Sequence, residues 1–165
     1  MTTLAGRNVL VVGASAGVGR AFAERAIRDG AHVVAAARRQ ERLDEIIADA
    51  GGGTGIVVDV RADGDPERLV DATVEALGGI DLLFFAAGVA PLRPLVDTEA
   101  DDWRYALETN VIGLQRTLAR AVPRMSSGAI AASLSSGLGC SQWKPTSMAS
   151  TEASGTCFAP TTWAS

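Results

Sequence analysis

The sequence predicts one α/β domain built on an open, parallel β-sheet with helices on both faces. Two observations support this fold class. Short apolar runs alternate with amphipathic helical segments through residues 1–136, and this alternation is typical of right-handed βαβ units. The apolar runs are also continuous, without alternating polar residues, which indicates parallel strands that are buried on both faces.

The expected strands are the short apolar runs of the chain. In order, they cover Arg7–Val12, His32–Ala36, Ile56–Val58, Ile80–Ala86 and Ala129–Leu134. Each is short enough for one strand of a compact sheet, and the stretches between them are long enough to hold a crossover helix.

The expected helices fill the connections between these strands. The first, Val18–Asp29, has apolar residues at helical spacing and is followed by a glycine. The second, Glu41–Ala50, carries its apolar residues on one face. The third, Asp65–Leu77, is expected to open with Asp65 as its N-cap and a proline at the first helical position. A long helix, Glu99–Met125, precedes the last strand.

Composition and charge limit the classes of partner. A chain of 165 residues that is 47% hydrophobic can bury one sizeable core. Its net charge of −4 argues against nucleic acid and anionic membranes, so small molecules are the expected partners. The chain lacks a signal-like start and a long apolar span, which predicts a cytoplasmic protein. Cys140 and Cys157 have no metal-binding spacing, and no metal site is expected.

A glycine-rich loop lies between the first strand and the first helix. It reads Gly13-Ala-Ser-Ala-Gly17-Val-Gly19. Gly13 would permit a tight turn, Gly17 the close approach of a pyrophosphate, and Gly19 close packing of helix on strand. A helix N-terminus at this point attracts anions. The alternative is a glycine turn that binds no ligand.

This loop resembles the cofactor loop of the short-chain dehydrogenase/reductase family, whose usual Thr-Gly-x-x-x-Gly-Ile-Gly has Val12 and Val18 as its two departures here. Three further segments resemble family motifs in the same order. They are Asp59-Val60, Phe85-Ala86-Ala87-Gly88, and Thr109-Asn110-Val111-Ile112-Gly113. The resemblance covers residues 5–136 and implies a Rossmann-type sheet with strand order 3-2-1-4-5.

The resemblance also implies a nicotinamide cofactor and a set of residues that contact it. Apart from two arginines considered next, these are Gly13, Ser15, Ala16, Gly17, Val18, Gly19, Asp59, Val60, Ala86, Ala87 and Gly88. The reaction implied is hydride transfer between the cofactor and a small-molecule carbonyl or secondary alcohol.

The end of the second strand favours NADP over NAD. An NAD site needs a carboxylate there for the ribose hydroxyls, whereas an NADP site needs cations for the 2′-phosphate. The strand is followed by Arg38 and Arg39, with no acid. Charge-assisted hydrogen bonds from Arg38, with Arg39 as a second donor, would hold that phosphate. The alternative is a solvated pair of charges that opens the second helix.

The implied catalytic residues form an incomplete set. By the resemblance, Ser136 would polarise the substrate oxygen, and Asn110 would hold a relay water. Asn110 has the alternative of a polar residue satisfied by solvent or by the carbonyl one turn earlier. The family's tyrosine and lysine are missing, because Ser150 and Ser154 occupy those places. The proton relay therefore lacks its acid, which costs about 10²–10⁴-fold in rate.

The pattern changes after residue 136. Residues 1–136 are expected to form the NAD(P)-binding domain, and residues 137–165 a divergent tail rich in serine and threonine. One hypothesis for the tail is a shifted reading frame that leaves the chain truncated relative to the family. Two functions follow as expectations: an NADP(H)-dependent oxidoreductase, or a non-catalytic nucleotide-binding module or inactive product. Assembly as a homo-oligomer is left open.

Overall fold

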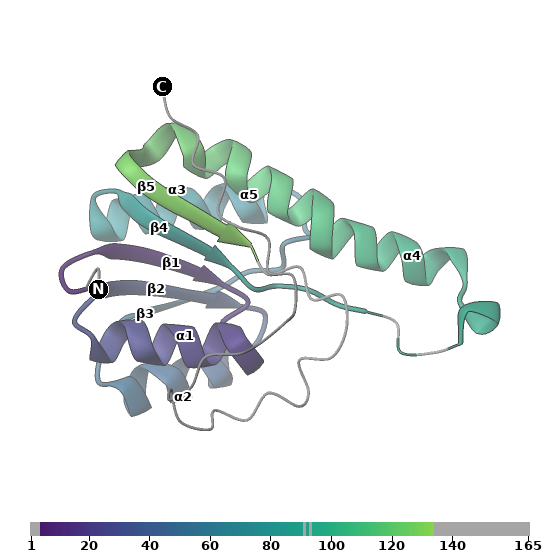
Figure 1. Cartoon of the computed structure of the whole chain (residues 1–165), viewed down its shortest axis with the longest axis horizontal. Helices are drawn as coiled ribbons and strands as arrows, with labels where there is room; N and C mark the ends of the chain where they lie inside the picture. Colours follow the sequence, from purple (N-terminus) through teal and green to yellow (C-terminus); the bar gives the residue numbers. More distant parts are fainter. Residues whose placement is uncertain (1–3, 91, 93, 134–165) are drawn as a thin grey trace, which may run out of the picture.

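The structure, a computed structural model, describes residues 4–90, 92 and 94–133. Within them, five parallel strands form one sheet in the order β3-β2-β1-β4-β5, which confirms the expected topology (Figure 1). The strands are β1 (Asn8–Val12), β2 (His32–Ala37), β3 (Thr54–Val57), β4 (Ile80–Phe85) and β5 (Met125–Ser133).

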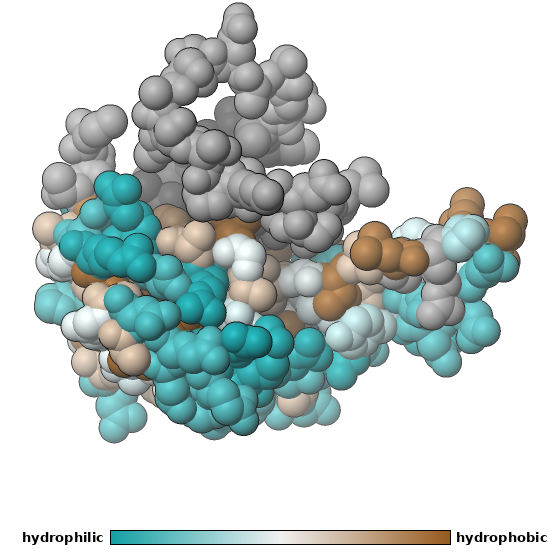
Figure 2. All heavy atoms as spheres, turned by 90° about the horizontal axis from the view of Figure 1, so that it is seen from below, coloured by the Kyte–Doolittle hydropathy of each residue, from teal (hydrophilic) through white to brown (hydrophobic). Residues whose placement is uncertain are grey.

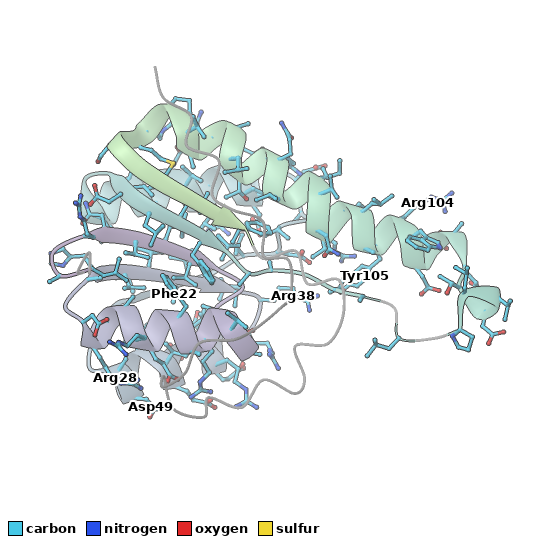
Figure 3. The ribbon with its side chains drawn as sticks, viewed as in Figure 1. Phe22, Arg28, Arg38, Asp49, Arg104 and Tyr105 are labelled. Atoms are coloured by element: carbon cyan, nitrogen blue, oxygen red, sulfur yellow. The ribbon has the colours of Figure 1, made fainter. Side chains whose placement is uncertain are left out.

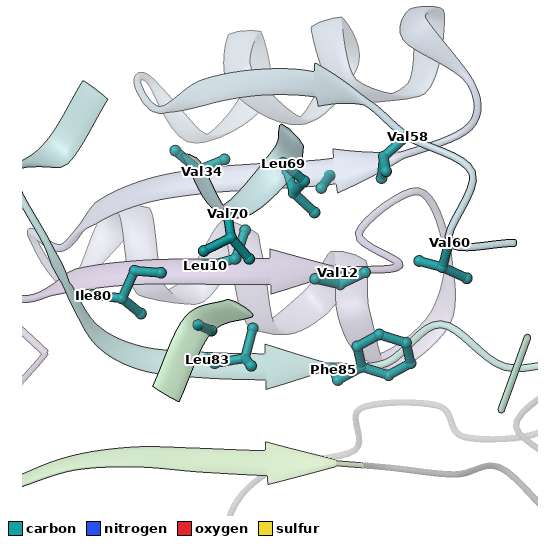
Figure 4. Packing of buried hydrophobic residues seen from close by; sticks show 12 residues of the cluster. Leu10, Val12, Val34, Val58, Val60, Leu69, Val70, Ile80, Leu83 and Phe85 are labelled. Atoms are coloured by element: carbon teal, nitrogen blue, oxygen red, sulfur yellow. The ribbon is translucent and has the colours of Figure 1, made fainter. Parts of the chain in front are cut away.

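Helices cover both faces of this sheet, as expected. The covering helices are α1 (Gly17–Arg28), α2 (Gln40–Ala50), α3 (Asp65–Leu77) and α5 (Gly113–Ala121). Successive strand residues point to opposite faces. Leu10 and Val12 therefore join a buried cluster with α3 and α5 (Figure 4), whereas Val9 and Val11 join one with α1 and α2. Because both faces of β1 are buried, its sequence is apolar throughout.

Arginines tie the helices to one another at the surface. On one face of the sheet, Arg20 of α1 bonds Glu24 on its own helix and Glu45 and Asp49 on α2. Figure 2 looks onto this side and shows a largely hydrophilic surface. On the other face, Arg116 of α5 forms a bidentate pair with Glu67 of α3, with both N–O distances 3.1 Å.

The long helix expected at Glu99–Met125 is continuous in space but not regular (Figure 1). It comprises α4 (Ala100–Leu107), a π-helical turn η2 (Glu108–Ile112), α5, and a short 3₁₀ turn η3 (Val122–Arg124). Another 3₁₀ turn, η1 (Leu95–Asp97), precedes α4. Pro123 has no N–H with which to continue α5, so the helix gives way to η3 there.

Three expected boundaries were wrong. Strand β5 begins at Met125, which pairs with Ile80, rather than at Ala129. Strand β3 begins and ends earlier than the expected Ile56–Val58. Asp65 is not the N-cap of α3, because Gly64 occupies that position with φ +79°. Instead, the Asp65 carboxylate accepts the backbone N–H of Asp59 at 3.0 Å, and this bond lowers the pKa of Asp65.

The Asn110 side chain fastens the π-helical turn to the segment that follows β4. Its Oδ1 accepts the backbone N–H of Val89 at 2.8 Å, and its Nδ2 donates to the Val89 carbonyl at 2.8 Å. This arrangement is neither of the expected alternatives, solvent or the carbonyl one turn earlier. Asn110 therefore joins two elements that are 21 residues apart in the chain.

Asn110→Ala should lower the free energy of unfolding by about 1–3 kcal/mol, because two partly buried hydrogen bonds are lost and the Val89 backbone groups lose their partner. Gln115→Ala is the matched control, since it removes an exposed amide from the next turn and should change stability by no more than about 0.5 kcal/mol. Urea unfolding of the three proteins measures both effects. Equal losses for the two variants would show that the Val89 contact contributes no stability.

A second prediction concerns pH. The Arg116 guanidinium lowers the pKa of Glu67 below its ordinary value of 4.5. A carboxylate with a lowered folded pKa contributes stability above its unfolded pKa and loses it as the pH falls through the folded value. The stability difference between the wild type and Glu67→Gln should therefore be largest near pH 7 and shrink below about pH 4.5.

Urea midpoints at several pH values measure that difference, with the exposed Glu75→Gln on the same helix as control. A Glu67→Gln difference that stays constant down to about pH 3 would contradict an ion pair as its cause.

Candidate functional site

A cleft of about 630 Å³ lies at the carboxyl edge of the sheet, beyond the ends of β1, β2, β3 and β4. Ligands of open α/β sheets bind at such an edge, where the strand order reverses. The structure brings together here every residue that the sequence predicted as a cofactor contact. They are Gly13, Ser15, Ala16, Gly17, Val18, Gly19, Arg38, Arg39, Asp59, Val60, Ala86, Ala87 and Gly88.

Gly13 and Gly19 let the β1–α1 loop pack tightly against its neighbours. Gly13 has φ +87°, and a Cβ there would come within 3.0 Å of the backbone of Ala86 and Ala87. A Cβ at Gly19 would come within 3.0 Å of the Gly13 carbonyl. Only glycine fits at either place without a shift of the backbone, in agreement with the predicted turn and helix packing.

Gly17 differs from these two glycines, because a Cβ there would meet no described atom within 4 Å. It is the first residue of α1, and the preceding Ala16 supplies no side-chain cap. The first turn of α1 also contains no acidic residue. Uncapped N–H groups at a helix N-terminus favour an anion, and this one lines the cleft.

The basic end of the cleft lies beyond β2. Here Arg38 Nη1 donates to the Tyr105 hydroxyl of α4 at 3.3 Å (Figure 3). Arg39 Nη2 donates to Ser15 Oγ at 3.2 Å. Among the described residues that line the cleft, the charged side chains are these two arginines and Asp59.

Asp59 does not leave this end acidic, because it pairs with Arg61. Its Oδ2 lies 3.5 Å from Arg61 Nη2, and its Oδ1 accepts the Arg61 backbone N–H at 3.0 Å. The Arg61 guanidinium in turn lies over the Tyr105 ring, 4.4 Å from the ring centre. The charged residues at this end of the cleft therefore follow two different strands, β2 and β3.

Sequence reasoning missed Tyr105 as a residue of the cleft. Tyr105 and Thr109 both line it, one helical turn apart, and Thr109 Oγ1 donates to the Tyr105 carbonyl at 2.9 Å. Thr109 belongs to a segment that resembles a family motif, and Tyr105, the only tyrosine of the chain, lies four residues before it. Residues at this spacing share a helix face, and this was the available signal that Tyr105 lies at the cleft.

The predicted catalytic residues are not brought together by the described part of the chain. Asn110 lies beside the cleft at Val89, which lines it. Ser136 lies outside the described residues, as do residues 137–165. Within the described residues there is no group of side chains suited to a metal ion, and no helix is long and apolar enough to cross a membrane.

Comparisons with known proteins agree with this geometry. The family model for short chain dehydrogenase matches residues 7–150. An uncharacterized oxidoreductase of Listeria monocytogenes is 32% identical over 125 residues, which are 73% of this chain and 50% of the relative. The human dehydrogenase/reductase SDR family member 2, mitochondrial, is 38% identical over 127 residues, 74% of this chain and 45% of the relative. The chain thus spans about half the length of these curated relatives.

Solved structures give the same result. A short chain dehydrogenase from Burkholderia cenocepacia, in complex with NADP, has a TM-score of 0.75 and 29% identity over 80% of this chain and 56% of the other. A short chain dehydrogenase/reductase from Burkholderia phymatum, in complex with NAD, has a TM-score of 0.74 and 29% identity over 81% and 50%. By its fold, its loop and these relatives, the chain belongs to the short-chain dehydrogenase/reductase family of oxidoreductases.

Proposed function

We propose that the cleft binds NADP(H), and that the chain forms the cofactor-binding part of an oxidoreductase acting on a carbonyl or secondary alcohol. The observation that carries the proposal is the pair Arg38 and Arg39, which line the cleft at the end of β2. An NAD-specific site needs an acid at this point, whereas a 2′-phosphate is a dianion that guanidinium groups bind well.

The other lining residues fit the rest of the cofactor. The loop from Gly13 to Gly19, with the uncapped start of α1, suits the pyrophosphate. Asp59 and Val60 would contact the adenine, and residues 86–88, which come directly after β4, would lie alongside the cofactor. The bound nicotinamide would supply or accept the hydride. In this proposal Ser136 polarises the substrate oxygen. Asn110 holds a relay water through the Oδ1 lone pair or the Nδ2 N–H that its bonds to Val89 leave unused.

The preference for NADP rests on this chain's own arginines. The two Burkholderia proteins were solved with NADP and with NAD respectively, so relatives of similar fold take either cofactor. Arg39 is partly engaged with Ser15, and Arg38 with an uncharged hydroxyl. Neither is paired with a carboxylate among the described residues, so both guanidinium groups keep donors that a phosphate could accept.

A second candidate function is nucleotide binding without turnover. The only tyrosine of the chain holds its hydroxyl against Arg38, at the end of the cleft assigned above to the 2′-phosphate. The only histidine, His32, begins β2 at the opposite edge of the sheet. Neither is placed to pass a proton to a substrate beside the nicotinamide. With serine at positions 150 and 154, this argues that the chain as written binds NADP(H) and does not reduce a carbonyl.

Arg38→Asp tests the cofactor choice. It should weaken NADPH binding by more than about 10-fold, because a charge-assisted bond is replaced by repulsion, and it should leave or improve NADH binding. Arg42→Asp makes the same change of charge near the start of α2, outside the cleft lining, and should affect both cofactors little. Fluorescence titration of the wild type and the two variants with each cofactor measures the six affinities. Equal NADPH affinity in both variants would mean that Arg38 is merely solvated.

The two candidate functions are separated by turnover. If the chain binds the cofactor without turnover, NADPH fluorescence changes on binding, and NADPH is not oxidised in the presence of a panel of ketones and aldehydes. Ser136→Ala should then change nothing, because groups that act as a unit contribute little once a partner is gone. Robust turnover that Ser136→Ala abolishes would reject the non-catalytic reading and leave the oxidoreductase.

A further inference from the structure

Tyr105 stands between two guanidinium groups that come from different strands. Its hydroxyl accepts a hydrogen bond from Arg38, which follows β2, and its ring lies under Arg61, which follows β3. The tyrosine itself belongs to α4, far from both in the chain. Figure 3 shows Arg38 and Tyr105 near each other beyond the ends of the strands. These contacts bridge three elements at one end of the cleft.

Tyr105 restricts an arginine that is otherwise free. Arg38 is exposed, and among the described residues Tyr105 is its side chain's hydrogen-bond partner. A long exposed arginine populates many rotamers, and a ligand that binds it must order it first. The bond to Tyr105 holds the guanidinium at the cleft that Arg38 lines. It uses one N–H of five, so donors remain for an anion.

Two residues besides Arg38 contact Tyr105. Arg61 stacks on its ring at 4.4 Å, and Asp59 holds Arg61 through its carboxylate. Thr109 bonds the Tyr105 carbonyl from the next turn of helix. The hydroxyl that accepts from Arg38 is therefore held in place from its own ring and from its own helix.

We propose that Tyr105 is a positioning residue for cofactor choice: with Arg61 behind it, it holds Arg38 ready for the 2′-phosphate of NADP(H). The inference rests on the proposed function and deepens it. NADH has no phosphate at this point, so the contribution of the hydroxyl should appear with NADPH and not with NADH. A purely structural tyrosine would affect both cofactors equally.

Tyr105→Phe tests this directly, because it removes the hydroxyl and keeps the ring under Arg61. It should weaken NADPH and the fragment 2′,5′-ADP by about 2- to 10-fold, the value of one hydrogen bond, with NADH changed less than about 2-fold. Tyr105→Leu removes the ring as well and should weaken NADPH further. Trp103→Leu, an exposed aromatic on the same helix, is the control and should leave the ratio of the two affinities unchanged.

The pairing with Arg38 gives a second readout. In an Arg38→Gln background, Tyr105→Phe should have little further effect on NADPH, because the group that the hydroxyl positions has changed. Calorimetry gives the affinities, and circular dichroism checks that each variant is folded.

The outcomes separate the two proposals. Equal weakening of NADPH and NADH by Tyr105→Phe, or no change in either, would overturn the role of Tyr105 while leaving NADP(H) binding intact. The role of Tyr105 would also be overturned if Tyr105→Phe weakened NADPH binding in the Arg38→Gln background as much as it does in the wild type. Failure of the wild type to bind either cofactor would instead reject the proposed function, and this inference with it.

Discussion

The β1–α1 loop passes between the ends of β2 and β4 with no room for a side chain at Gly13, and the cleft depends on this passage. The Gly13 and Ala14 N–H groups donate to the Ala36 carbonyl, and the Ala86 N–H donates to the Val12 carbonyl. The loop is thus held by the strands on both sides of β1. Because Gly19 packs directly on Gly13, α1 starts at the sheet edge, and its first three residues, 17–19, line the cleft.

Charge divides the cleft into two ends. Toward β1 and β4 it is lined by small and apolar residues, whereas beyond β2 and β3 it carries Arg38, Arg39 and Asp59, with Arg61 beside them. Asp59 is occupied by Arg61, so the net charge of this end is positive. An otherwise acidic protein, with net charge −4, therefore presents a local site for an anion. This contrast supports the proposal that the cleft takes a phosphorylated ribose rather than a free one.

The sheet and the glycine-rich loop could be predicted because both follow from residues that are close together in the sequence. Continuous apolar runs set the strands, and the glycine spacing set the turn that follows β1. The π-helical turn at Glu108–Ile112 could not, because it accompanies a contact between Asn110 and the backbone of Val89 in another segment. Tyr105 was missed for a similar reason: its neighbours Arg38 and Arg61 come from other strands. The early start of β5 likewise follows from the pairing of Met125 with Ile80.

The most direct test of this account is a calorimetric titration of the unmodified chain with NADPH and with NADH under the same conditions. The account predicts one binding site and an affinity for NADPH at least about 10-fold higher, as expected when guanidinium groups gain a phosphate dianion. Equal affinities, or tighter binding of NADH, would contradict the role given to the arginines beyond β2. Binding of neither cofactor would contradict the assignment of the cleft itself.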